Sequence, residues 1–242
     1  MGESAGLGPN DEVLEIGPGL GILTRELLRR ARRVVAAELD PVLAKQLPDL
    51  APSGCLEVVQ GDALELDPAQ HFAGPYKLLA NLPYQITSPV LSRYLVDVRR
   101  PEVLVLMVQL EVAERVVARP GRASYLSNLV QAVADVRLVR RVAPGAFYPP
   151  PKVTSAVLHI LPRAEREVSD DLLPGFLELV QAGFTQPRKT LANSLAQGLG
   201  LPRKQVEARL VAAGIDSGAR PQHLQIADWL ALLHARADAG DT

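Results

Sequence analysis

The chain has 242 residues, of which 48% are hydrophobic, and a formal net charge of −1. This length supports one domain with a small second one, and the composition supplies a sizeable core. The charge balance argues against indiscriminate nucleic-acid binding but leaves room for a local basic face. No run of about 18 uncharged apolar residues occurs, and the first residues lack a signal-peptide pattern, so we expect no membrane span and a cytoplasmic location.

The cysteine count bears on the cellular compartment, and the histidine spacing bears on metal binding. Cys55 is the single cysteine, which excludes an internal disulfide and suits a reducing cytoplasm. The four histidines show no ligand spacing. We therefore expect no metal site.

The first two-thirds of the chain alternates apolar strand patterns with helical ones. Strands are expected over 13–16, 34–37, 56–59, 78–80 and 103–108, with helices over 20–30 and 42–50. Such alternation predicts a parallel sheet covered by helices. Two later apolar segments, 136–142 and 153–161, predict a hairpin at the edge of the sheet.

A charged segment over 162–171 predicts a linker. Only helical patterns follow it, at 172–184, 189–199, 203–213 and 226–237. We therefore expect an α/β domain over 1–164 and a small all-helical domain over 165–242.

The first predicted strand ends in a glycine-rich turn, 15–21, with the sequence Glu-Ile-Gly-Pro-Gly-Leu-Gly. Glycines let the backbone turn sharply and approach a ligand closely. The spacing is not that of the dinucleotide fingerprint. It suits a nucleoside whose tail is an amino acid rather than a pyrophosphate, although such turns are frequent in α/β proteins.

Acidic residues follow the second and third predicted strands. Glu38 stands about 20 residues beyond the glycines, where a carboxylate can accept both ribose hydroxyls. Asp40 precedes Pro41 and fits a helix N-cap at least as well as a ligand contact. Asp62 could accept from an adenine amine or could simply begin a helix or turn. Since the carboxyl ends of parallel strands share one crevice, these residues and the glycine loop predict an S-adenosylmethionine site.

The fourth predicted strand ends in Asn81-Leu82-Pro83-Tyr84. The Asn81 side-chain carbonyl and the backbone carbonyl of the Leu82-Pro83 stretch can both accept hydrogen bonds from an exocyclic amine. Proline makes the turn stiff and removes a donor, and Tyr84 offers a face for stacking a base. An ordinary strand-ending turn also explains Asn and Pro here. Beside the predicted cofactor site, the motif favours methyl transfer to an amine.

Together these motifs give the chain a resemblance to the KsgA-type ribosomal RNA adenine dimethyltransferases, from residue 8 onward. The matching segments are 13–19, 38–40, 61–63, 81–84, 109–113, 146–153 and 184–190. The resemblance implies a Rossmann-like methyltransferase sheet, S-adenosylmethionine as cofactor and a helical RNA-binding domain. It also implies a monomer that dimethylates N6 of two adjacent adenosines in the 3′-terminal hairpin loop of small-subunit (16S) rRNA, as naked RNA or in a pre-assembled subunit.

The resemblance further implies roles for the residues that match. Glu38 would hold the cofactor ribose, Asp62 its adenine, and Glu15 with the glycine loop its methionine end. Further cofactor contacts are implied for Gly17, Pro18, Gly19, Leu39, Ala63 and Asn81.

The acceptor base would lie between two aromatic side chains. Asn81 and the Leu82 carbonyl would orient the target N6, next to Pro83, while Tyr84 and Phe147 would sandwich the flipped adenine. Phe147 precedes three prolines, which force a rigid extended segment and suit a fixed platform, although the ring could also pack a loop.

Few residues can be selected as candidates for RNA phosphate contacts. From Pro151 onward the chain carries ten basic and ten acidic residues, so the helical domain is not basic overall. Most surface arginines are solvated or paired. We select Arg188 and Lys189, which lie within a matching segment.

One departure from the family concerns the N-terminus. Family members carry a longer arm with a Gln-(Asn/His)-Phe-Leu segment that closes over the cofactor, whereas ten residues precede Asp11 here. We expect this chain to bind S-adenosylmethionine more weakly than a relative with the arm.

Three other functions share part of this pattern. They are a large-subunit rRNA adenine methyltransferase, a non-catalytic RNA-binding, ribosome-assembly or transcription factor of the same fold, and a DNA adenine methyltransferase. The Pro-Pro-Pro-Lys-Val run at 149–153 favours the small-subunit enzyme, and the intact set of Glu15, Glu38, Asp62 and Asn81 argues against lost catalysis.

Overall fold

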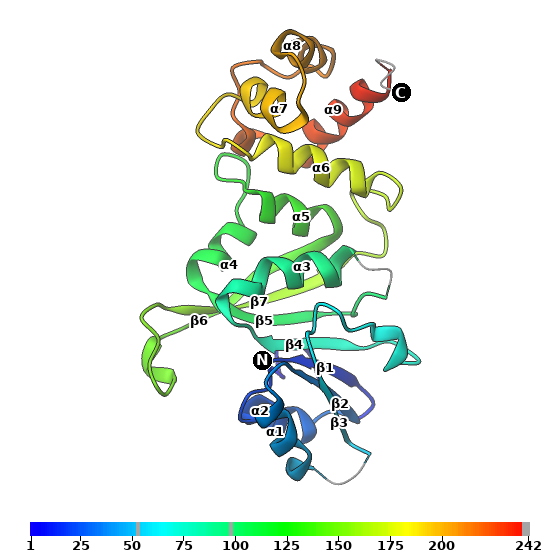
Figure 1. The fold of residues 1–242 in the computed structure, drawn as a ribbon, viewed down its shortest axis with the longest axis vertical. Coiled ribbons are helices and arrows are strands. Elements are labelled where there is room, and N and C mark those ends of the chain that lie inside the picture. The colour runs from blue at the N-terminus through cyan, green and yellow to red at the C-terminus, as the bar shows by residue number, and fades with distance from the viewer. Residues whose placement is uncertain (52–53, 97–98, 239–242) are drawn as a thin grey trace. The chain divides into compact units, whose positions relative to one another are not determined.

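The computed structural model describes residues 1–51, 54–96 and 99–238, without the side chains of Tyr84 and of residues 236–238. The chain forms two compact units (Figure 1). The first consists of Met1–Glu114 and Ala134–Pro162, and the second of Arg115–Val133 and Arg163–Thr242. The second unit thus contains the region expected to be helical and adds residues 115–133, which the sequence assigned to the first domain.

The first unit is built on a seven-stranded sheet of order β3-β2-β1-β4-β5-β7-β6. Its strands are β1 (Glu12–Ile16), β2 (Arg33–Glu38), β3 (Leu56–Gln60), β4 (Lys77–Asn81), β5 (Leu104–Gln109), β6 (Ala134–Val142) and β7 (Ser155–Pro162). Strands β1 to β5 pair in parallel, whereas β7 pairs antiparallel with both β5 and β6. The predicted parallel sheet with an edge hairpin is confirmed.

The central strands are mostly apolar because both of their faces are covered. Val13, Leu14, Val34 and Leu79 are completely buried. The helices associated with these strands are α1 (Ile22–Leu28), α2 (Pro41–Gln46) and α3 (Thr87–Val96), and α4 (Leu110–Val116) leads out of the unit. Short 3-10 turns are η1 (Leu47–Leu50), η2 (Pro68–Gln70), η3 (Tyr84–Ile86) and η4 (Pro144–Ala146). The described part of the chain has no helix long and apolar enough to cross a membrane.

The second unit is helical. It contains α5 (Tyr125–Val133), α6 (Leu173–Gly183), α7 (Leu191–Leu199), α8 (Arg203–Ala212), the 3-10 turn η5 (Pro221–His223) and α9 (Ile226–Asp238). Its core gathers around Trp229 of α9, which is fully buried and lies near the Phe184 ring at a centroid distance of 6.1 Å.

Helices α6 and α7 approach each other so closely that only glycine fits at position 198. A Cβ atom there would lie 2.6 Å from the Cα of Ala182, which is backbone and cannot move aside. We expect Gly198→Ala to lower the free energy of unfolding, because overpacking of about 1–3 kcal/mol exceeds the gain of roughly 1 kcal/mol in helix propensity. Urea unfolding midpoints measure the change.

Gly175→Ala is the matched control in α6. Its added Cβ would meet only the flexible end of Leu233, at 3.3 Å, so its midpoint should stay equal or rise. Equal midpoints for the two variants would show that α6 and α7 are free to separate.

Candidate active site

The order of the strands reverses between β1 and β4. Strands β2 and β3 follow on one side of β1, and β4 and β5 lie on the other. In parallel sheets of this kind, ligands bind outside the carboxyl ends of the strands at the point of reversal. Ile16 pairs with Ala37 on one side and with Ala80 on the other, so the glycine loop emerges between Glu38 and Asn81. The structure therefore brings these predicted residues to one edge of the sheet.

The glycine loop after β1 depends on backbone conformations that other residues rarely adopt. Gly17 and Gly19 have φ angles of 66° and 57°, in the left-handed region. The Gly17 amide donates to the Ala37 carbonyl at 3.0 Å, which anchors the start of the loop to β2. A Cβ on Gly19 would meet no atom within 4 Å. The loop therefore leaves open space at the crevice, as a cradle for a ligand requires.

Glu38 holds the glycine loop against the end of β2. Its Oε2 accepts from the Gly19 amide at 3.0 Å and its Oε1 accepts from the Asp40 amide at 2.9 Å. The side chain is only 6% exposed, yet each carboxylate oxygen has further acceptor capacity for a ribose hydroxyl. Asp40 itself accepts from the Val42 and Leu43 amides. The predicted N-cap role of Asp40 is confirmed.

Glu15 is a buried carboxyl group at the crevice whose pKa is raised. It is 1% exposed, and its Oε2 has no hydrogen-bond partner in the part of the chain that the structure describes. Burial raises the pKa of Glu15 to about 7, the negative charge of Glu38 adds to the rise, and the neighbouring Thr24 hydroxyl opposes it without reaching hydrogen-bond geometry. No cation among the described residues contributes to this pKa, so the ionised carboxylate has no compensating charge in that part of the chain.

The loop after β3 is held by side chains that sequence analysis missed. The Tyr94 hydroxyl donates to the Ala63 carbonyl at 2.7 Å. Arg93 donates to the carbonyls of Leu64 and Leu66. No sequence signal marks these two residues of α3, because their partners are backbone atoms about thirty residues away. Asp62 is exposed, and its Oδ1 accepts from the Leu64 amide at 2.8 Å, so it does form the turn that was considered.

The Asn81 side chain is exposed at the end of β4 and makes no hydrogen bond to any described residue. Leu82 anchors the turn, because its side chain is buried and its amide donates to the Met107 carbonyl at 3.1 Å. Pro83 approaches the glycine loop, where its Cδ would lie 3.9 Å from a Cβ on Gly17. The side chain of Tyr84 lies outside the described residues.

Phe147 belongs to the connection between β6 and β7. Strand β6 runs parallel to β5, since both are antiparallel to β7, so its carboxyl end lies at the same edge as Asn81. The Leu110 amide donates to the Thr154 carbonyl, which ties the other end of this connection to the end of β5. Phe147 is half-buried there. Arg188 and Lys189 lie in the second unit before α7, where both are exposed and their side chains make no hydrogen bond or ion pair with a described residue.

A doubly wound sheet with this strand order, a short glycine loop, an acidic residue ending β2 and an Asn-Leu-Pro-Tyr turn ending β4 defines the class of S-adenosylmethionine-dependent methyltransferases. Within that class the particular family follows from comparison with known proteins. The chain belongs to the ribosomal RNA adenine dimethylase family, whose sequence profile matches residues 3–238.

Named relatives support this membership. The chain is 43% identical to a ribosomal RNA small subunit methyltransferase A of Dehalococcoides mccartyi, covering 93% of this chain and 79% of the relative. It is 45% identical to the protein of the same name from Syntrophotalea carbinolica, covering 93% and 86%. The predictions of family, fold class and enzyme class are confirmed.

Solved structures agree. A dimethyladenosine transferase from Plasmodium falciparum superposes with a TM-score of 0.80 at 26% identity, covering 98% of this chain and 94% of that chain. The 23S rRNA methyltransferase ErmE superposes with a TM-score of 0.69 at 34% identity, covering 96% and 93%.

Proposed function

We propose that the chain transfers methyl groups from S-adenosylmethionine to N6 of two adjacent adenosines in the 3′-terminal hairpin loop of small-subunit rRNA, giving N6,N6-dimethyladenosine. The observation that carries the chemistry is the unengaged Asn81 amide at the strand reversal, beside the glycine loop. The choice of the small subunit is supported by the 43% and 45% identity to small-subunit methyltransferases.

The residues at the crevice fit S-adenosylmethionine. Glu15 offers an unpartnered buried carboxylate oxygen to the ammonium group, the turn at Gly17 and Gly19 offers space, and Glu38 offers acceptors to the ribose. Leu39, whose side chain is 70% exposed, offers an apolar surface to the adenine ring, and Asp62 an acceptor to its amine. When bound, the cofactor supplies an electrophilic methyl group on its sulfonium.

The protein's own part in the reaction is to hold the amine. Asn81 Oδ1 and the Leu82 carbonyl would each accept a hydrogen bond from N6, which fixes the nitrogen and draws its lone pair out of the ring. Phe147 and Tyr84 would hold the extruded base between them. The reaction needs alignment of the acceptor nitrogen with the methyl group rather than a strong base, and this rigid turn can supply that alignment.

The RNA would contact the second unit through its phosphates. Arg188 and Lys189 are both exposed on the segment that precedes α7. Loop adenosines are the appropriate target, since unpaired bases are cheap to unstack. The similarity to ErmE makes a large-subunit target the one alternative that a specific observation favours.

The proposed function is tested with labelled S-adenosylmethionine and two substrates, small subunits isolated in unmethylated form and unmethylated large-subunit RNA. We expect label in N6,N6-dimethyladenosine from the 3′-terminal hairpin of the small-subunit RNA and none in the large-subunit RNA. Label only in the large-subunit RNA would show that the chain is a large-subunit rRNA adenine methyltransferase. Absence of label in both, with a folded protein, would refute the proposed function and leave a non-catalytic binding factor or a DNA adenine methyltransferase.

A further inference from the structure

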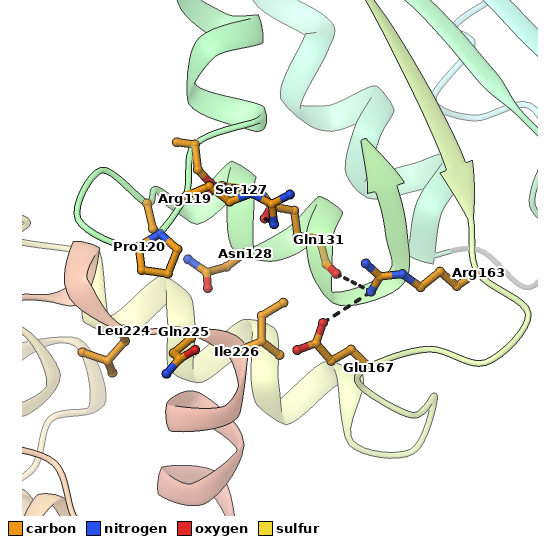
Figure 2. A pocket seen from close by; sticks show the side chains of 12 residues that line it. Arg119, Pro120, Ser127, Asn128, Gln131, Arg163, Glu167, Leu224, Gln225 and Ile226 are labelled. Carbon is orange, nitrogen blue, oxygen red and sulfur yellow. Dashed lines mark hydrogen bonds and ion pairs between the residues drawn. The ribbon is translucent and has the colours of Figure 1, made fainter. Parts of the chain in front are cut away.

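The second unit contains a pocket of about 180 Å³ that the proposed methyl transfer does not use (Figure 2). It lies between the loop before α5, the helix α5 itself and the start of α9. Pro120, Leu224 and Ile226 supply apolar surface, while Ser127 and Asn128 supply polar groups. The volume is below that of sites for drug-sized ligands and suits a single ring system.

Asn128 presents an unpartnered acceptor to this pocket. The residue is only 4% exposed, and its Nδ2 donates to the Ser124 carbonyl at 2.9 Å. That hydrogen bond assigns the positions of Nδ2 and Oδ1 in the side-chain amide, since only the nitrogen can donate to a carbonyl. Oδ1 has no hydrogen bond to a described residue, and in Figure 2 it points toward the space between α5 and α9. The pocket therefore offers this acceptor to an N–H or O–H donor of a ligand.

The polar groups of Gln131 and Arg163 are already held by contacts within the protein. Gln131 Nε2 donates to the carbonyls of Val116 and Ala118, both at 2.9 Å. Gln131 Oε1 accepts from Arg119, and the Gln131 carbonyl accepts from Arg163 at 3.0 Å. Arg163 is further held by Glu167, as Figure 2 shows. These contacts hold this part of the polar wall in place, whereas the exposed Gln225 side chain, which also lines the pocket, makes no hydrogen bond to a described residue.

Arg119 gives the rim of the pocket a positive charge. It is exposed, and its side chain makes one hydrogen bond to a described residue, to Gln131 Oε1 at 3.4 Å, which leaves most of its guanidinium donors available. A ring seated against Leu224 and Ile226 could thus keep a phosphate at the rim. Proteins hold unpaired nucleotides with a surface for the base, hydrogen-bonding groups for its edge and cations for the phosphate. Here the aliphatic side chains of Leu224 and Ile226 take the place of the usual aromatic ring.

We propose that this pocket binds the base of an unpaired adenosine or cytidine of RNA, with the exocyclic amine donating to Asn128 Oδ1 and the phosphate near Arg119. Uracil is disfavoured, because its one N–H lies between two carbonyl oxygens that would face the same acceptor. That the ligand is RNA rests on the proposed function. The pocket would secure a second nucleotide apart from the methyl acceptor.

The test uses the full ¹⁵N-labelled chain and four probes, AMP, CMP, UMP and ribose 5-phosphate, followed by nuclear magnetic resonance. We expect the Asn128 side-chain amide and the backbone amides of Ser127 and Gln131 to shift with AMP or CMP. Half-saturation with UMP should need at least about fivefold more ligand, as loss of one buried hydrogen bond implies. Ribose 5-phosphate should leave these signals in place. Equal shifts with all four probes, or none at the pocket, would overturn the proposal.

Two variants make the result specific to the pocket. Ala123→Leu fills the space from a partly exposed position and should abolish the AMP shifts of Gln131. Arg119→Gln should weaken AMP binding, whereas Arg122→Gln removes the same charge three residues away, outside the pocket, and should not. Equal weakening by both arginine variants would mean non-specific attraction and refute the site. Methyl transfer enters none of these measurements, so failure of the proposed function and failure of the pocket are separate results.

Discussion

Replacing Asn81 by alanine is expected to lower the single-turnover rate of methyl transfer at least about 100-fold, because the variant can no longer orient the acceptor amine. The side chain is exposed and makes no hydrogen bond within the described protein, so its removal sacrifices no structural contact. Leu82 keeps the turn in place through its buried side chain and its hydrogen bond to Met107. The thermal midpoint should therefore stay that of the parent.

The measurement is a single-turnover assay with saturating cofactor and unmethylated small subunits. Asn10→Ala is the matched control, since Asn10 is also exposed but precedes β1. It should retain the parent rate. A rate loss below about tenfold for Asn81→Ala, with an unchanged fold, would contradict the orienting role of Asn81 and leave the Leu82 carbonyl as the group that orients the amine.

The sequence predicted the sheet well, because buried parallel strands are short apolar runs with turn residues between them. All seven strands lie within two residues of their expected bounds. Helices were expected between the strands, but no bounds were predicted for α3, α4 and α5. Helix α4 begins at Leu110, directly after β5 ends at Gln109, so no loop or cap signal separates the two elements. The grouping of residues 115–133 with the second unit depends on long-range packing, which no local pattern encodes.

At the site, the sequence predicted which residues reach the crevice but not what holds them. Strand-end positions follow from the alternation of elements, so Glu15, Glu38 and Asn81 could be placed together in advance. The contacts of Glu38 with the Gly19 amide and of Tyr94 with the Ala63 carbonyl could not. Both involve backbone atoms distant in sequence, which carry no residue-specific signal.

Glu15→Gln is expected to stabilise the folded protein at alkaline pH. Burial raises the pKa of Glu15 from 4.5 to about 7. Below pH 4.5 the carboxyl is protonated in both states and the pKa difference has no effect. As pH rises from 4.5 to about 7 the unfolded chain ionises Glu15 first, so stability falls, and above that range a loss of about 3 kcal/mol persists. Glutamine removes the charge at nearly constant shape.

Urea unfolding at pH 4.5 and pH 8 separates this effect from packing. The free energy of unfolding of Glu15→Gln should exceed that of the parent by up to about 3 kcal/mol at pH 8 and by little at pH 4.5. Glu65→Gln, at an exposed position, is the control and should match the parent at both pH values. A difference independent of pH would attribute the change to packing instead.

The same variant should lose cofactor affinity, because the ionised Glu15 carboxylate is what the proposed site offers to the ammonium group. In the parent, the Kd for S-adenosylmethionine should rise about tenfold between pH 8 and pH 6, as protonation of Glu15 withdraws the binding-competent form. In Glu15→Gln the Kd should be high at both pH values and nearly constant. Calorimetry measures the Kd at the two pH values. If the Kd changed equally with pH in the parent and the variant, Glu15 would not be a cofactor contact. Opposite changes in stability and affinity would instead show that this carboxylate is kept buried for binding, at the expense of stability.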